Sequence, residues 1–303
     1  TEKKELRNYL FATDTRTTSN STLPWSNSTT TPKITQIRDN LHANYMATLF
    51  PKSRWLSWEA TENDEALDYK RIVTEGYMYD KIRRSDFEVQ ISKLIADWID
   101  YGNCFATVDF HRDYTALEDG EVIPGYAGPV VKRISPYDIA FDPTAESFTK
   151  THKIVKTIVD LGSIKKAIAD DPANEYLKGV FDKMISVRNV IRSTDSEIHK
   201  SEGFVADGFG NVTMYYESDY VELLTFYGSV YDSSTDELRE NRIITVADRG
   251  YILSDIPQPS WIGSDNIFHV GWRERPDNLY AMGPLDNLVG LQYRIDHLEN
   301  MKA

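Results

Sequence analysis

Residues 85–114 read SDFEVQISKLIADWIDYGNCFATVDFHRDY, and the period of the hydrophobic side chains changes in the middle of this stretch. Before Gly102 the apolar residues recur every three or four positions, as on one face of a helix, and after it they alternate with polar residues, as in a strand. The predicted helix buries one stripe, formed by Phe87, Ile91, Leu94, Ile95, Trp98 and Ile99. The stretch therefore predicts a helix over 85–101 that leads into a strand over 104–114, and with them an α+β fold.

Signals for helix ends support these boundaries. Ser85 and Glu88 have the spacing of a capping box, and Gly102 is the residue type that most often ends a helix. Two further amphipathic helices are expected upstream, over 33–50 and 63–82. The second has one apolar side, formed by Ala66, Tyr69, Ile72, Val73 and Tyr77. Consecutive amphipathic helices are expected to cover one another or one face of a sheet.

Beyond the strand that follows Gly102, the pattern is mainly that of short strands. Strands are expected at 129–134 and 152–161, followed by two short helices that open at Ser163 and Asp171. A β meander is then expected over about 211–253, with strands at 211–216, 220–232 and 242–253 and a tight turn at 248–250. This meander is predicted to be a small β module of its own.

The two ends of the chain have different patterns. Residues 1–32 are rich in Ser, Thr and Asn and predict an extended, mostly irregular arm. Residues 283–303 predict a helix that opens at Gly283-Pro284. Its apolar seam is formed by Leu288, Leu291, Ile295 and Leu298, and its polar faces by Asp286, Arg294, Asp296, Glu299 and Lys302. A narrow seam of this kind favours packing against another helix, in the same chain or in a neighbour.

The composition bounds the function. The net charge is −13, and Lys and Arg never cluster beyond pairs, so tight DNA binding through a basic patch is not expected. An acidic surface would instead let DNA pass without sticking, because like charges repel. No apolar run approaches the ~18 residues of a membrane span, and the start is too polar for a signal peptide. The single cysteine, Cys104, is expected to be a structural thiol in a reducing cytoplasm.

No motif for catalysis or for a cofactor is present. The six histidines are scattered, and the sequence has no HExxH zinc motif, no phosphate-binding P-loop and no GxSxG serine elbow. Asp142 and Glu146, in FDPTAES, are the best carboxylate pair for a glycan hydrolase or a metal-dependent nuclease. The same residues are better explained as a turn in which Asp142 and Glu146 are exposed to solvent. We therefore expect no enzyme activity, no metal and no cofactor.

Several stretches, taken in order, resemble one known family. They are TTPKITQIRDNLHANYMATLFP (30–51), ALDYKRIVTEGYMYDKIRRSDFEVQISKLIADWIDYGNCFATVDF (66–110), VVKRISPYDIAFDPTAES (130–147), VELLTFYGSVYD (221–232) with RIITVADRGYIL (242–253), and ERPDNLYAMGPLDNLVGLQYRIDHLENMKA (274–303). They are similar to the portal, or head-to-tail connector, protein of tailed bacteriophages, closest to the type of short-tailed phages. The last stretch departs from the family's junction pattern in having Ala281 where the family usually has its first Gly, and Asp296 or His297 near the usual Asn.

The resemblance implies a fold and a domain organisation. The fold would be an α+β portal wing, with helices packed on a mixed β region and a small barrel-like or meander module, leading into a stem helix. The wing would span 33–282 after the arm of 1–32, and 283–303 would be the start of the stem helix. The clip, second stem helix and crown of the family have no counterpart in these residues.

The resemblance also implies a function. Portals form a ring, dodecameric in the virion, at one capsid vertex, where they nucleate capsid assembly and pass double-stranded DNA in and out without reading its sequence. The partners would be further copies of the chain, the major capsid protein, the terminase and a tail adaptor. The ring would assemble in the cytoplasm of the bacterial host. The polar residues of 283–303 named above would face the channel and the seam would pack on helices.

Two other classes remain open from the sequence. A carboxylate-dependent glycan hydrolase would need a concave pocket with converging acids. Another phage structural protein, such as a tail or baseplate adaptor, would share the scarcity of catalytic motifs. A portal wing should instead be a wedge with interlocking side faces.

Overall fold

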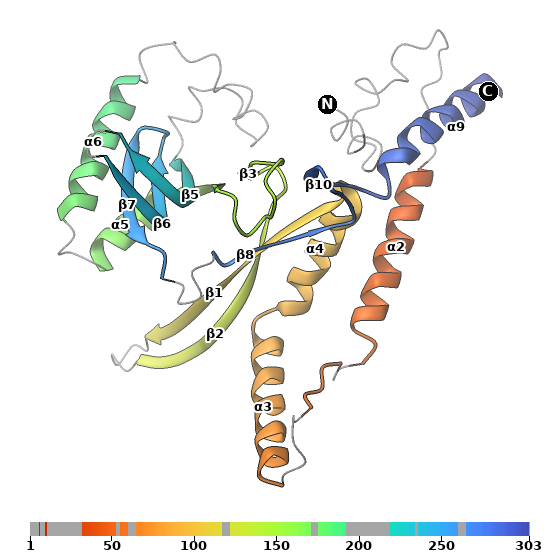
Figure 1. The fold of residues 1–303 in the computed structure, drawn as a ribbon, viewed down its shortest axis with the longest axis horizontal. Helices are drawn as coiled ribbons and strands as arrows, with labels where there is room; N and C mark the ends of the chain where they lie inside the picture. The colour runs from red at the N-terminus through yellow and green to blue at the C-terminus, as the bar shows by residue number, and fades with distance from the viewer. Residues whose placement is uncertain are drawn as a thin grey trace. The chain divides into compact units, whose positions relative to one another are not determined.

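The computed structural model describes Leu6, Leu10 and residues 32–52, 55–59, 65–116, 122–170, 175–191, 219–233, 236–259 and 265–302. These residues form an α+β fold, and every strand pairing among them is antiparallel (Figure 1). The chain divides into two compact units. Unit 1 comprises Thr1–Pro136, Pro143–Thr149 and Asn266–Ala303, and unit 2 comprises Tyr137–Asp142 and Lys150–Asp265.

Unit 1 combines helices with two small sheets. Its helices are α2 (Lys33–Leu49), α3 (Glu65–Arg84), α4 (Phe87–Tyr101) and α9 (Val289–Lys302), the last preceded by a 3₁₀ turn, Asp286–Leu288. Its strands are β1 (Asn103–Ala116), β2 (Val122–Ile134), β8 (Ile267–Gly271), β9 (Arg273–Arg275) and β10 (Asn278–Met282). The strands are ordered β2-β1-β8 in one sheet and β10-β9 in the other. The three predicted N-terminal helices and the strand after Gly102 are confirmed.

The change from helix to strand takes place at Gly102. Its φ of 73° is left-handed, its N–H donates to the carbonyl of Trp98, and its own carbonyl accepts the N–H of Trp272 at 2.8 Å. A Cβ on Gly102 would lie 2.3 Å from the backbone nitrogen of Gly283. Only glycine combines this φ with so close an approach of a second backbone. The end of α4 is therefore fixed against the segment that leads to α9.

The predicted capping box at the start of α4 is wrong. The preceding helix α3 continues to Arg84, and the hydroxyl of Ser85 donates to the carbonyl of Ile82 instead of capping α4. Asp86, at φ 52°, is the residue that precedes α4, and its side chain makes no capping bond. The two helices meet in an elbow of two residues, Ser85 and Asp86, and this short junction leaves no room for an extended N-cap.

The core of unit 1 includes two residues of the predicted arm. Leu6 and Leu10 are helical and buried, and the carbonyl of Leu10 accepts a hydrogen bond from the Thr35 hydroxyl at 2.9 Å. They pack in one cluster of buried side chains with Ile34, Ile95, Ile99 and Leu285. The extended arm is therefore wrong at these two positions, because two leucines four residues apart supply an apolar face that the core can bury. The rest of residues 1–31 lies outside the described part of the chain.

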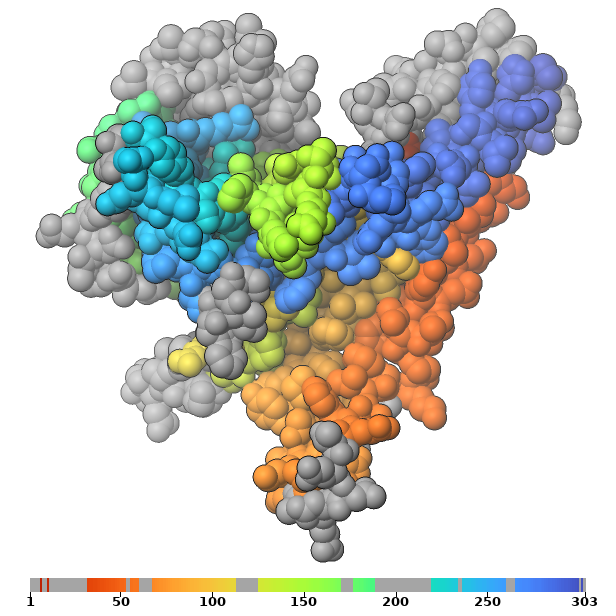
Figure 2. Space-filling view, viewed as in Figure 1, coloured from red at the N-terminus to blue at the C-terminus, as the bar shows by residue number. Residues whose placement is uncertain are grey.

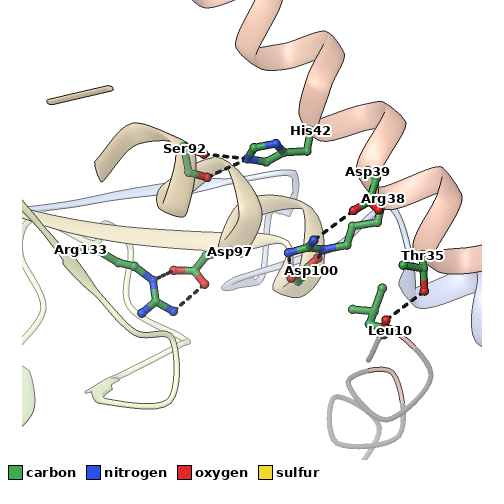
Figure 3. Close-up of polar contacts among 9 residues, drawn as sticks. All are labelled: Leu10, Thr35, Arg38, Asp39, His42, Ser92, Asp97, Asp100 and Arg133. Atoms are coloured by element: carbon green, nitrogen blue, oxygen red, sulfur yellow. Dashed lines mark hydrogen bonds and ion pairs between the residues drawn. The ribbon is translucent and has the colours of Figure 1, made fainter. Parts of the chain in front are cut away.

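Polar contacts hold α4 from two sides (Figure 3). From α2, the Arg38 guanidinium makes a two-pronged pair with Asp100 at 2.7 and 3.0 Å, and His42 contacts Ser92. From β2, Arg133 makes a two-pronged pair with Asp97. Burial raises the pKa of Asp97, and the adjacent Arg133 opposes that effect. These pairs fix the rotation of α4 between the helices and the sheet.

Unit 2 is a five-stranded sheet with two helices. The strand order is β3-β4-β5-β6-β7, built from β3 (Ile139–Phe141), β4 (Lys153–Asp160), β5 (Tyr220–Asp232), β6 (Glu237–Ala247) and β7 (Tyr251–Pro257). Helices α5 (Leu161–Asp170) and α6 (Glu175–Ile191) supply Ile164, Phe181 and Met184 to a core shared with the sheet. The predicted tight turn is confirmed, since Asp248 and Arg249 both have positive φ.

The β module is larger than the sequence suggests. The meander β5-β6-β7 pairs through β5 with β4, from Asp160↔Tyr220 to Lys153↔Tyr227, so the module includes strands that precede it in the sequence by more than 50 residues. The strand predicted at 211–216 lies outside the described residues. On the buried side, Arg188 of α6 pairs with Asp248 at 2.7 Å and locks that helix to the β6-β7 turn.

Candidate interaction surfaces

Helix α9 buries a face that contains polar residues. Asp296 is 0% exposed, and its Oδ1 accepts a hydrogen bond from the Gln292 side chain at 2.8 Å. The Gln292 Oε1 in turn accepts the backbone N–H of Ile34, at the start of α2. The buried face of α9 therefore joins it to α2 through a polar chain. Asp296, predicted to lie on an exposed polar face, does not do so in this structure.

The predicted apolar seam of α9 is split between two faces. Leu288 and Ile295 are partly buried, whereas Leu291 and Leu298 are 52% and 50% exposed. Arg294 and Glu299 are exposed as expected, and Asp286 accepts the N–H of Gly283 at 2.8 Å. The side chain of Lys302 lies outside the description. The exposed apolar side of α9 is formed by Leu291, Leu298 and Met301.

Helix α3 carries an exposed apolar stripe. The stripe is formed by Tyr69, Ile72, Val73 and Tyr77, which are 52–70% exposed. These four residues were predicted to form one side of the helix, and they do, but no described element covers that side. Gly76 lies within the same helix, and a Cβ added there would meet no described atom within 4 Å beyond its chain neighbours and the helix's own backbone. We call this surface the α3 stripe.

The remaining side chains of α3 are also only partly covered by the rest of the chain. None of the described side chains of this 20-residue helix is buried. In Figures 1 and 2, α3 extends to the lower end of unit 1, away from α9. A helix of this length that contains a glycine and several β-branched or aromatic residues is marginal in water without tertiary contacts. An exposed apolar patch of this kind is typical of a site of association, so the α3 stripe is a candidate interaction surface.

The acids considered for catalysis lie on the surface. Asp142 and Glu146 are both exposed, and residues 143–146 form turns and bends, as predicted. Within the described ranges, no group of three or more His, Cys, Asp and Glu side chains could hold a metal ion. In the same residues, no helix combines the length and apolarity needed to cross a membrane.

Cys104 is poorly suited to act as a nucleophile. Burial raises the pKa of its thiol to about 11, and the nearby Asp97 carboxylate adds to the effect. Its Sγ lies 3.7 Å from the carbonyl of Val270 on the neighbouring strand. A thiol with so high a pKa is almost fully protonated at neutral pH, and the thiolate is the reactive form.

Two comparisons with known proteins find no match. No family model matches the chain, and no curated protein matches it significantly. Sequence periodicity locates the α3 stripe but misreads it as buried, because the pattern of an apolar side is the same whether the chain itself or a partner covers it.

Proposed function

We propose that this chain is the wing and the beginning of the stem helix of a bacteriophage portal, a structural ring protein at one capsid vertex. The α3 stripe carries the proposal. It is an apolar surface on a helix that its own chain leaves uncovered, and a closed ring of copies would supply the cover. The order of the motifs quoted above supports the same assignment.

The charge of the chain fits passage of DNA through such a ring. With a net charge of −13 per copy, a ring accumulates negative charge and repels phosphate instead of binding it. In this role the protein acts without catalysis, and its partners are the major capsid protein, the terminase, a tail adaptor and double-stranded DNA. It would be assembled in the host cytoplasm and incorporated in the virion.

The proposal is tested by the assembly state of the purified chain. Mass photometry and electron microscopy should find closed rings with a central opening. Ile72→Lys, which places a charge in the α3 stripe, should shift the population toward monomers. Val187→Lys is the matched control, because Val187 is also an exposed apolar residue on a helix, α6 of unit 2. It should leave the rings intact.

Two results would overturn the proposal. One is a purified chain that stays monomeric at every concentration measured. The other is a glycan-hydrolysing activity that disappears when Asp142 and Glu146 are replaced, which would establish the hydrolase instead. Circular dichroism of each variant confirms that the helices are retained.

A further inference from the structure

A cavity of about 660 Å³ lies at the elbow between α3 and α4. Its lining includes the aromatic rings of Trp55 and Phe87 and the charged side chains of Asp86, Glu88 and Arg83. This volume falls within the range of small-ligand and peptide side-chain sites, roughly 300–1,000 Å³. None of the roles discussed above uses it.

The aromatic wall of the cavity is built in advance from distant segments. The rings of Trp55 and Phe87 are stacked, with centroids 6.2 Å apart and an angle of 12°, and Phe50 at the end of α2 meets both edge-on. The Tyr79 hydroxyl accepts the N–H of Leu56 at 2.8 Å and donates to the carbonyl of the same residue. The segment that carries Trp55 is thereby tied to α3, so the wall is rigid before a ligand arrives.

The charges around this wall are mostly negative. Three carboxylates, those of Asp80, Asp86 and Glu88, line the cavity together with one guanidinium, that of Arg83. Asp80 has only a long, exposed pair with Arg84, at 3.7 Å. Among the described residues, no ion pair or side-chain hydrogen bond engages the carboxylates of Asp86 and Glu88. An apolar wall beside carboxylates without internal partners favours a cation with an apolar stem.

We propose that this cavity is a docking site for a basic peptide segment of a different protein, with an arginine or lysine side chain laid on Trp55 and Phe87. Its cationic head pairs with Asp86 and Glu88, and the Arg83 guanidinium donates to the peptide's backbone carbonyls. The partner is expected to be a different, basic protein because this chain is acidic overall, with a net charge of −13. The three carboxylates that line the cavity attract a basic segment.

Calorimetric titration with a defined probe tests the site. The probe is acetyl-Gly-Arg-Leu-Arg-Leu-Gly-amide, added to the full 303-residue chain. A single class of site should be occupied, and binding should weaken as salt is added. Glu88→Lys and Asp86→Lys should each weaken binding about tenfold or more, equivalent to ~1.4 kcal/mol. Glu240→Lys, the same change at an exposed acid of unit 2, should alter affinity less than about twofold.

Two further probes separate the alternatives. Replacing both arginines of the peptide by citrulline, which is neutral and nearly isosteric, should abolish binding. Spermidine should compete only weakly, because it lacks the backbone carbonyls that pair with Arg83. Binding that is unchanged in Glu88→Lys, retained by the citrulline peptide, or displaced fully by equimolar spermidine would each overturn the proposal. The proposal would also be overturned if Glu88→Lys lost self-association as well as peptide binding, because the substitution would then disturb the fold or the ring and not the cavity alone.

This inference stands independently of the ring. Glu88→Lys rings should still assemble, since the cavity and the α3 stripe use different residues. Mass photometry of the titrated samples therefore distinguishes the failure of one proposal from the failure of the other.

Discussion

At Gly102, the addition of a single Cβ atom is expected to destabilise the fold. Gly102→Ala would add a Cβ at φ 73° and 2.3 Å from the Gly283 nitrogen, where the obstacle is backbone and cannot swing away. The expected loss of stability is about 2–4 kcal/mol, from the left-handed conformation and the overpacking together. Chemical denaturation of the variant measures it.

Gly179→Ala is the matched control for Gly102→Ala. Gly179 lies within α6 with no atom within 4 Å of an added Cβ, so alanine should stabilise the protein by about 0.5–1 kcal/mol. Equal effects of the two substitutions would contradict the role given to Gly102.

His269 predicts how stability depends on pH. Burial lowers the pKa of His269, and Glu274 opposes the effect. Its Nε2 lies 3.0 Å from the Asn103 Oδ1, which also accepts the N–H of Ala281 at 2.9 Å. Because that oxygen is an acceptor, His269 must be the donor in this contact, so its Nε2 carries a proton.

The sign of the effect follows from linkage. The folded state binds a proton at His269 less readily than the unfolded state, so this contribution to stability is present above the unfolded pKa of about 6.5 and is lost as pH falls below it. His269→Gln keeps a donor and removes the titration. The difference in unfolding free energy between parent and variant should therefore shrink from pH 8 to pH 5. A difference that grows over this range, or an NMR titration of His269 with a midpoint above 6.5, would refute the assignment.

The anchoring of α4 predicts an asymmetry between the two members of one ion pair. The side chain of Asp97 is 5% exposed and that of Arg133 is 33% exposed. Arg133→Met strands a buried carboxylate and should cost about 3–5 kcal/mol, whereas Asp97→Asn leaves an arginine that reaches water and should cost less. Thermal or chemical unfolding of both variants checks the order.

The same pair predicts a pH-dependent rescue. Without Arg133, the pKa of Asp97 should rise further, since burial already raises it and Arg133 is the main opposing group. A raised folded pKa contributes stability below the unfolded pKa of about 4 and loses it as pH increases through the folded value. The deficit of Arg133→Met relative to the parent should thus be smaller at pH 4.5 than at pH 8. A deficit that is the same at both values would mean that lost packing, not the stranded charge, causes it.

Charge reversal at the two acids of α9, Asp296 and Glu299, should have different effects, because one is buried and the other is exposed. Asp296→Lys would bury a cation against Gln292 and should cost roughly 3 kcal/mol or more, so it reports on folding and not on the channel. Glu299 is exposed, and Glu299→Lys should leave the melting temperature within a degree or two.

If the chain forms the proposed ring and α9 lines its channel, Glu299→Lys should slow DNA passage, and most strongly at low salt. Packaging and ejection rates at two salt concentrations measure this. Unchanged rates at low salt in intact rings would place Glu299 outside the channel, while leaving the ring itself unaffected.

Local sequence patterns predicted several of the helices, strands and turns. The helix of 87–101, the strand after Gly102 and the turn at Asp248-Arg249 each depend on residues close together in the chain, and each was predicted within a few positions. The capping box failed because its letters also fit the end of the preceding helix. A cap is decided by where the previous element stops, which is not encoded in four residues.

In contrast, which side chains are buried depends on the tertiary structure. An apolar stripe has the same sequence pattern on a helix that packs inside the chain and on a helix that a partner covers. The pattern therefore left open whether the seam of 283–303 packs in the same chain or in a neighbour, and it did not show that the α3 stripe is exposed. Asp296 is the reverse case: a carboxylate reads as exposed, yet Gln292 and the start of α2 enclose it. The sheet of unit 2 likewise joins strands that are far apart in sequence. Local periodicity reports which side of an element is apolar, whereas long-range packing decides what that side meets.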